Sequence, residues 1–166
     1  MENKIATLPI KIYGDPVLRK RASKINNIEQ EDILTIERMA ETMYSNEGIG
    51  LAAPQIGISK QIIIADGEGN LIKLINPVIL EMGKEEQGKE GCLSIPNIYV
   101  EIKRPSYILV EGLNERGKQV KIEAGGLLAR ILQHEIDHLN GILIVDYASP
   151  LSRVLVKRQL KKIRRL

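Results

Sequence analysis

The chain contains the run Gln133-His134-Glu135-Ile136-Asp137-His138, which follows an apolar stretch that begins at Gly125. In a helix, residues four apart lie on the same face, so the imidazoles of His134 and His138 can converge on one metal ion. Glu135 then lies beside the first ligand, where it can act as general base on a metal-activated water instead of binding the metal. Both histidines of the chain lie in this run. We therefore predict that His134 and His138 are metal ligands and that Glu135 is catalytic.

A catalytic site of this kind needs a third protein ligand, because three ligands and one open position are the usual arrangement. Downstream of His138 the chain has no His or Glu and a single Asp, Asp146. Upstream, the one cysteine of the chain lies in Glu90-Gly91-Cys92-Leu93-Ser94. A lone cysteine often serves as a small buried hydrophobic residue. Next to two prospective histidine ligands, however, the thiolate of Cys92 is the better candidate for the third ligand.

A third segment, Gly48-Ile49-Gly50-Leu51-Ala52-Ala53-Pro54-Gln55, is too rich in Gly and Pro for the interior of a helix or strand. It lacks the Lys-Ser/Thr ending of a phosphate-binding loop. Small residues here would let the backbone come close to a bound chain, and Gln55 offers a side-chain amide that can donate to an oxyanion. The alternative is a connection whose glycines serve only tight turns.

Together, residues 48–55, 90–94 and 133–138 resemble the three signature motifs of the peptide deformylase family, in its order and spacing. The resemblance extends to Asp15-Pro16-Val17-Leu18-Arg19, Asn76-Pro77 and Gly141, and so covers nearly the whole chain. It implies a metallohydrolase that removes the formyl group from the N-terminal formyl-methionine of newly synthesised polypeptides and releases formate. It also implies one divalent metal ion per chain, with Fe²⁺ favoured and Zn²⁺ as the alternative.

The resemblance further implies roles for single residues. It assigns the oxyanion donors to the Gln55 side chain and the backbone N–H of Leu93. It implies that the peptide lies extended against the backbone, as an added strand whose recognition depends little on downstream side chains. The expected peptide-binding residues are Gly48, Ile49, Gly50 and Gly91.

The resemblance also bears on Asp137 and Tyr99. The family pattern pairs Asp137 with an arginine that matches Arg104, although an exposed helix charge is the alternative for Asp137. Tyr99 stands where some relatives carry an arginine, so the resemblance does not fix the substrate contacts there.

The composition is that of one soluble domain. The 166 residues suffice for a single core, and the hydrophobic and charged fractions are 43% and 27%. Aromatic residues make up only 3%, with no Phe or Trp, so the core must be aliphatic. The N-terminal residues contain no apolar stretch long enough for a signal peptide or a membrane span. We expect residues 1–166 to form one cytoplasmic domain without a membrane contact.

Periodicity predicts the order of the secondary structure elements. A helix is expected over residues 28–45, with a capping box at Asn27 and Gln30. A β-hairpin is expected at 61–65 and 71–75, a solvated loop at 83–89, and further strands at 99–102, 107–110 and 119–122. The motif helix should span about 127–139, and a last helix should begin at Ser149-Pro150. This order indicates an α+β protein. The resemblance implies the deformylase fold, in which antiparallel sheets surround a central metal-binding helix, with one N-terminal and one C-terminal helix.

The C-terminal segment carries the positive charge of the chain. From Pro150 onward there are seven basic residues and no acids, so the first 149 positions hold 17 of the 24 basic and all 21 acidic residues, a net charge of −4. We expect a stripe of Leu151, Val154, Leu155, Leu160 and Ile163 to pack against the protein. The basic face is then either a solvated surface or a docking site for ribosomal RNA, a role that the resemblance makes plausible. The basic residues are Arg153, Lys157, Arg158, Lys161, Lys162, Arg164 and Arg165.

Two other classes of protein remain open on the sequence alone. A zincin-like endopeptidase shares the H-E-x-x-H pattern but would need a downstream third ligand and a long open cleft. A structural or binding protein on the ribosome or a nucleic acid could hold a metal through two His and one Cys. Structural sites usually have four protein ligands, however, and no fourth is evident here. If the protein kept its metal after substitution of Cys92, the endopeptidase class would be favoured. If the wild type showed no deformylase activity, the structural or binding class would be favoured.

Overall fold

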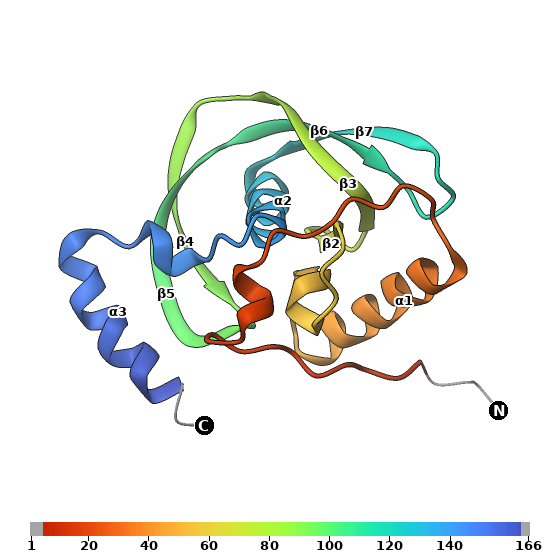
Figure 1. Cartoon of the computed structure of the whole chain (residues 1–166). Helices are drawn as coiled ribbons and strands as arrows, with labels where there is room; N and C mark the ends of the chain where they lie inside the picture. The colour runs from red at the N-terminus through yellow and green to blue at the C-terminus, as the bar shows by residue number, and fades with distance from the viewer. Residues whose placement is uncertain (1–4, 164–166) are drawn as a thin grey trace.

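A computed structural model of the chain describes residues 5–163 and shows an α+β arrangement with a helix at its centre (Figure 1). Five strands form one antiparallel sheet in the order β1-β2-β3-β6-β7, and β4 and β5 form a separate antiparallel pair. The larger sheet consists of β1 (Gly50–Ala52), β2 (Ile62–Asp66), β3 (Leu71–Met82), β6 (Tyr107–Leu113) and β7 (Gln119–Gly125).

The larger sheet curves over α2 (Gly126–Leu139) and supplies one side of its core (Figure 1). The burial of β6 alternates along the strand, as expected where one face packs on a core and the other faces water. Side chains such as Val110 in β6 and Ala129 and Leu132 in α2 are fully buried in one cluster. The central helix is therefore held by the sheet on one side, which leaves its other side for chemistry.

Residues 85–89 belong to a strand and only residues 83–84 lie outside one, so the expectation of a solvated loop over 83–89 is wrong for most of the segment. β4 (Glu85–Cys92) pairs with β5 (Ile95–Pro105) from Glu85↔Pro105 to Cys92↔Ile95. The polar side chains of β4 are mostly exposed, whereas alternate apolar residues of β5 are buried. Because the apolar face comes from β5 and the backbone pairing comes from both strands, β4 carries no hydrophobic alternation of its own. This hairpin brings Cys92 to the centre of the molecule.

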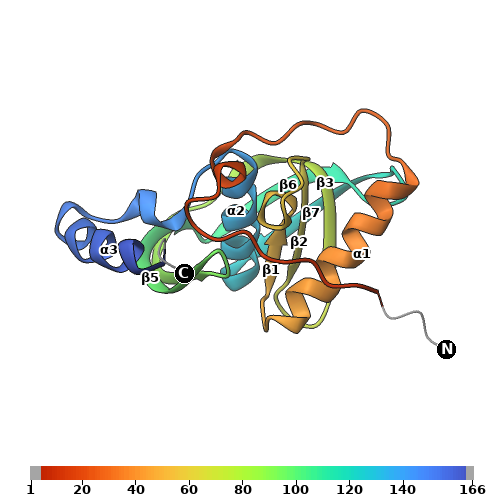
Figure 2. The same cartoon turned by 60° about the horizontal axis from the view of Figure 1, so that its bottom comes forward.

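The N-terminal helix α1 (Gln30–Ser45) packs beside β1 and β2 (Figure 2). Met39 and Met43 are fully buried with Ile62 and Ile64 in an aliphatic cluster. The capping box expected at Asn27 and Gln30 is wrong. The N-cap is Glu29, whose backbone N–H donates to the Asp32 carboxylate at 3.0 Å.

The central helix α2 ends at a position that only glycine fits easily. Gly141 has a positive φ of 72°, and a Cβ there would lie 2.6 Å from the backbone oxygen of Arg19. The backbone N–H groups of Gly141 and Ile142 donate to the carbonyls of His138 and Asp137, which closes the last turn. The C-terminal end of the helix, which carries His138, is thereby held against the short 3₁₀ helix Pro16–Arg19.

The C-terminal helix α3 (Pro150–Ile163) begins as expected, with Ser149 as N-cap and Pro150 as first residue. The expected packing stripe is only partly right. Val156 and Leu160 are buried in the cluster around β5, and Ile163 packs against it. Leu151, Val154 and Leu155 are 87%, 57% and 63% exposed, because α3 meets the protein through the opposite face. Of the basic residues, Arg164 and Arg165 lie outside the described residues.

Among residues 5–163, no helix combines the length and the apolar composition needed to cross a membrane.

Candidate metal centre

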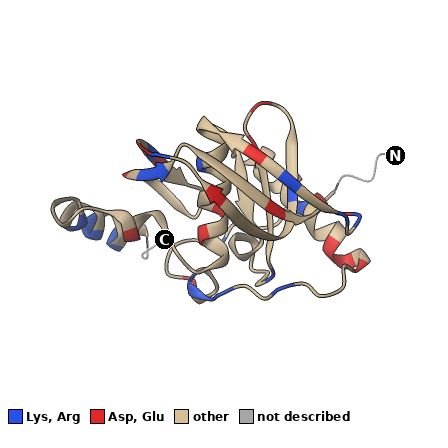
Figure 3. Ribbon diagram, turned by 90° about the horizontal axis from the view of Figure 1, so that it is seen from above, with Lys and Arg blue, Asp and Glu red and all other residues tan. Residues whose placement is uncertain are grey.

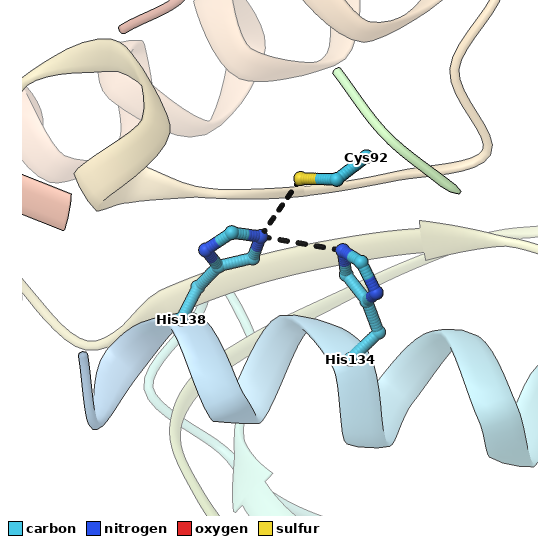
Figure 4. A group of neighbouring side chains, drawn as sticks. All are labelled: Cys92, His134 and His138. Carbon is cyan, nitrogen blue, oxygen red and sulfur yellow. Dashed lines mark hydrogen bonds between the residues drawn. The ribbon is translucent and has the colours of Figure 1, made fainter. Parts of the chain in front are cut away.

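The three predicted metal ligands meet between α2 and the end of β4 (Figure 4). The Sγ atom of Cys92 lies 3.3 Å from Nε2 of His138, and the two Nε2 atoms of His134 and His138 lie 3.2 Å apart. The three donor atoms are all within 4.8 Å of one another. Two imidazole nitrogens and one thiol that point at a common position form a donor set suited to a divalent transition metal. The residues therefore fit a metal ion.

A carboxylate behind His134 sets the orientation of that ligand. Nδ1 of His134 lies 3.0 Å from Oε2 of Glu90, and this oxygen can accept only if the ring carries its proton on Nδ1. The lone pair on Nε2 is then directed at the other two ligands, which is the arrangement of a carboxylate–histidine–metal unit. Burial raises the pKa of Glu90, but the hydrogen bonds to His134 and Arg104 outweigh it and lower the pKa to about 2. Glu90 is thus an anion throughout the physiological range.

Two arginines compensate the buried charge of Glu90. Nε and Nη2 of Arg104 donate to its two oxygens at 2.6 and 3.0 Å, and Nη1 of Arg130 donates to Oε1 at 3.0 Å. Arg104 also donates to Asp137 at 2.8 Å, which confirms the predicted pair. The Tyr147 hydroxyl donates to the same Asp137 oxygen at 2.7 Å. These contacts tie β4, β5 and α2 together directly behind His134.

Glu135 lies on the cleft side of α2 and is only 4% exposed. Its Oε2 atom has no hydrogen-bond partner among the described residues. Burial raises the pKa of Glu135 to about 7. A carboxylate that titrates near neutral pH suits general base catalysis. Gly50 lies against it, since a Cβ on Gly50 would be 2.5 Å from Oε1 of Glu135.

The amide of Gln55 is fixed in one orientation. Its Oε1 accepts from the backbone N–H of Ala52 at 2.9 Å, and its Nε2 donates to Ser94 at 3.1 Å. Nε2 also lies 3.5 Å from Sγ of Cys92. Because Gln55 is 2% exposed and bonded on both sides, its N–H groups are held toward the metal ligands without further ordering.

The predicted site residues come together in one cleft of about 630 Å³. Leu93 and Gly48 touch across it, because a Cβ on Gly48 would be 2.8 Å from Cδ1 of Leu93. Tyr99 also lines it, with its ring packed on Gly91. His138 is buried behind this surface. The predicted residues in the cleft lining are Gly48, Ile49, Gly50, Gln55, Gly91, Cys92, Leu93, His134 and Glu135.

Three contributions to the site were not assigned from the sequence. Glu90 orients His134, Ser94 orients Gln55, and Arg130 donates to Glu90 and to two backbone carbonyls of the β4–β5 pair. For Glu90 a signal was present, because a ligating histidine usually bonds a carboxylate or carbonyl through its other ring nitrogen. For Ser94 and Arg130 no spacing rule links them to their partners.

Comparison with known proteins gives consistent matches. A model of the polypeptide deformylase family matches residues 7–154. The peptide deformylase of Thermotoga maritima is 49% identical over 157 residues, which cover 94% of this chain and 96% of that protein. The crystal structure of a peptide deformylase from Legionella pneumophila has a TM-score of 0.91 and 40% identity, and the match covers 96% of each chain. That of a peptide deformylase from Synechococcus elongatus in complex with actinonin has a TM-score of 0.87 and 46% identity, with 94% of this chain and 85% of that chain covered.

Proposed function

Because the chain belongs to the peptide deformylase family, we propose that its Cys-His-His cluster holds the metal ion of a deformylase and that Glu135 is the general base. The enzyme hydrolyses the formyl group from the N-terminal formyl-methionine of polypeptides. The observation that carries the assignment is the convergence of Cys92, His134 and His138 beside the buried carboxylate of Glu135 in one cleft.

Cys92, His134 and His138 would hold a divalent ion, which would supply Lewis acidity to lower the pKa of a water molecule and to polarise the formyl carbonyl. Glu135 accepts the proton of the attacking water and later passes it to the leaving amine, so that the peptide departs as a neutral amine and formate is released. The negative charge that develops on the formyl oxygen is met by Nε2 of Gln55 and the backbone N–H of Leu93. The hydrogen bond of Gln55 to Ser94 supports this role, because it orders the amide before the substrate arrives.

The substrate peptide binds as an added strand. β1 is the edge strand of its sheet and pairs only with β2 among the described strands, so the other edge of Gly50 is open to the cleft. β4 faces the same cleft through Glu90 and Gly91. Backbone hydrogen bonds from an edge strand recognise a peptide without regard to its sequence. This suits an enzyme whose substrates share only their first residue.

Formate release from formyl-Met-Ala-Ser tests the proposed activity directly. The purified, metal-loaded protein should hydrolyse this tripeptide, and actinonin, with which the Synechococcus elongatus relative was crystallised, should suppress the reaction. The acetyl-Met analogue is the matched control, since the added methyl group must fit between Gln55 and the ligands. Failure to release formate, or equal turnover of both peptides, would contradict the assignment.

We also propose that the bound ion is Fe²⁺ and predict that activity is sensitive to air. The thiolate and two imidazoles bind Fe²⁺ or Zn²⁺, but only Fe²⁺ is oxidised by oxygen. Protein purified without oxygen should contain about one iron per chain and lose most of its turnover on exposure to air. Protein loaded with Zn²⁺ is the control and should keep its lower activity in air. Full activity in air with zinc bound would refute the preference for iron but not the ligand set.

The ribbon of α3 carries several Lys and Arg positions (Figure 3), and we further propose that this helix docks on ribosomal RNA through its basic residues. Lys157, Arg158 and Lys161 are exposed on a helix without acidic residues, which supports binding to phosphates. Ribosome co-sedimentation should fall when four α3 residues are changed to Gln (Lys157, Arg158, Lys161 and Lys162), and wild-type binding should weaken steeply with salt.

The matched control for α3 removes the same charge elsewhere, by changing Lys20, Arg21, Lys24 and Lys118 to Gln. Equal co-sedimentation of the two variants at low salt would contradict docking through α3. A parallel loss of turnover on a free tripeptide would show instead that α3 serves the fold.

We infer that residues 1–166 form one domain, which is supported by the contacts of α2 with strands of both sheets. We also infer a cytoplasmic location, which is supported by the nature of the substrate, a newly synthesised polypeptide.

A further inference from the structure

A second hollow, the α3 groove, lies beside the catalytic cleft and contains none of the proposed catalytic residues. Its volume is about 810 Å³, and it lies between α3, the segment around Ile12 and the start of β5. Ile12, Ile98 and Ile163 give it apolar walls. Asn97, Gln159 and Lys162 contribute the polar groups. The mechanism proposed above does not use this groove.

The α3 groove is continuous with the catalytic cleft. Pro96 and Asn97 line both hollows, and both residues are exposed. They directly follow Ile95, which pairs with Cys92 at the end of the β4–β5 hairpin. Leu93 and Tyr99 line the cleft but not the groove. A chain that leaves the cleft past Leu93 can therefore enter the groove by crossing only Pro96 and Asn97.

We propose that the α3 groove binds the part of the substrate polypeptide that follows the first residues after formyl-methionine. The proposal rests on the deformylase function, because the occupant is covalently attached to the group that reacts. The formyl end is fixed at the metal ligands, and an extended chain advances about 3.3–3.6 Å per residue, so a polypeptide must continue over the surface beyond the cleft.

The chemistry of the groove fits a peptide of mixed sequence. The side-chain amides of Asn97 and Gln159 each offer a donor and an acceptor, which suits backbone N–H and C=O groups. The apolar walls favour Leu, Ile or Val side chains. Lys162 is the one charged residue of the lining, so an acidic side chain should be preferred over a basic one. The groove would thus favour some long substrates over others, although the cleft itself binds the residues after methionine mainly through their backbone.

The test compares kcat/KM for formyl-Met-Ala-Ser with that for two nonapeptides that begin with the same three residues. One nonapeptide continues with alternating Leu and Glu, and the other with alternating Leu and Lys. The Leu/Glu nonapeptide should exceed the tripeptide by about tenfold, because burial of one or two apolar side chains outweighs the cost of ordering the peptide. The Leu/Lys nonapeptide should show a smaller gain.

Two variants locate the effect. Ile12→Asp places a charge on an apolar wall and should abolish the gain for the Leu/Glu nonapeptide, while the tripeptide is hydrolysed at the wild-type rate. Lys162→Glu, on the exposed surface of α3, should reverse the preference between the two nonapeptides. Leu151→Asp is the matched control, because Leu151 is 87% exposed on the same helix and does not line the groove.

Equal kcat/KM for all three peptides would refute binding of the substrate in the α3 groove. The deformylase function would remain intact, since hydrolysis of the tripeptide measures that function separately. An unchanged nonapeptide preference in Lys162→Glu would refute binding in the groove as well. A length effect that appears only after removal of residues 164–166 would assign the groove to the C-terminus of this chain instead of the substrate.

Discussion

Replacement of Glu135 by Gln is expected to lower kcat for formyl-Met-Ala-Ser by about a thousandfold while the bound metal stays near one per chain. The two side chains have nearly the same shape, but an amide cannot accept the proton of the attacking water. The ligands are separate residues, and Oε2 of Glu135 has no partner within the described part of the chain that the substitution would remove. The loss should therefore appear in turnover, not in metal content or folding.

Formate release and elemental analysis on the same preparation measure these two quantities together. Glu101→Gln is the matched control, because it makes the same chemical change on the exposed face of β5, and it should have wild-type turnover. If Glu135→Gln retained more than about a tenth of the wild-type kcat, Glu135 would not be the general base, and another proton acceptor would have to be sought.

The central helix and the placement of its two histidines were predictable because their geometry is local. Residues at positions i and i+4 of any helix share a face, so the positions of His134 and His138 follow from sequence spacing alone. The partnership of Cys92 with them depends instead on the β4–β5 hairpin. Cys92 could nevertheless be predicted, because it is the one cysteine of the chain and because residues 90–94 resemble a family motif. Residues that lie 46 positions apart, such as Cys92 and His138, have no spacing rule that would place them together.

The predictions for β4 and for part of α3 were wrong because tertiary contacts override the local sequence pattern in these segments. β4 has no apolar alternation, and its backbone pairs with β5, whose Ile98, Val100 and Ile102 supply the buried face. On α3 two sets of apolar residues are present, and sequence periodicity does not show which one meets the protein. The structure buries Val156 and Leu160 and leaves Leu155 exposed. Both choices depend on the surface that a neighbouring element presents, which a single-sequence pattern does not contain.

The charges behind the metal ligands show why a buried cluster can be stable here. Glu90 and Asp137 are paired with Arg104 and Arg130, so that the charges of two carboxylates are balanced by those of two guanidinium groups. Breaking one buried pair costs about 3–5 kcal/mol, because the remaining charge is left without a partner. The network therefore fixes the distance between β4, which carries Cys92, and α2, which carries both histidines. Rigid support of this kind is what a metal site with ligands from distant segments requires.

Cys92→Ala is expected to reduce bound metal from one per chain to less than about a tenth after dialysis against a weak chelator, and to abolish turnover. Only the two histidines of α2 would remain, and the chain contains no third histidine to replace the thiolate. Cys92→Ser is the matched comparison, because it keeps the size of the side chain and supplies an oxygen in place of sulfur. It should hold metal more weakly than wild type and more tightly than Cys92→Ala.

Thermal unfolding provides the second measurement for this prediction. A metal that binds only the folded state raises its stability in proportion to the logarithm of the free metal concentration. Added metal should therefore raise the Tm of the wild type but not that of Cys92→Ala. Both should unfold cooperatively, because Cys92 is a small, partly buried side chain at the border of an apolar cluster. Full metal content in Cys92→Ala would refute Cys92 as a ligand. It would restore the endopeptidase alternative, in which Asp146, the one acidic residue downstream of His138, would have to complete the site.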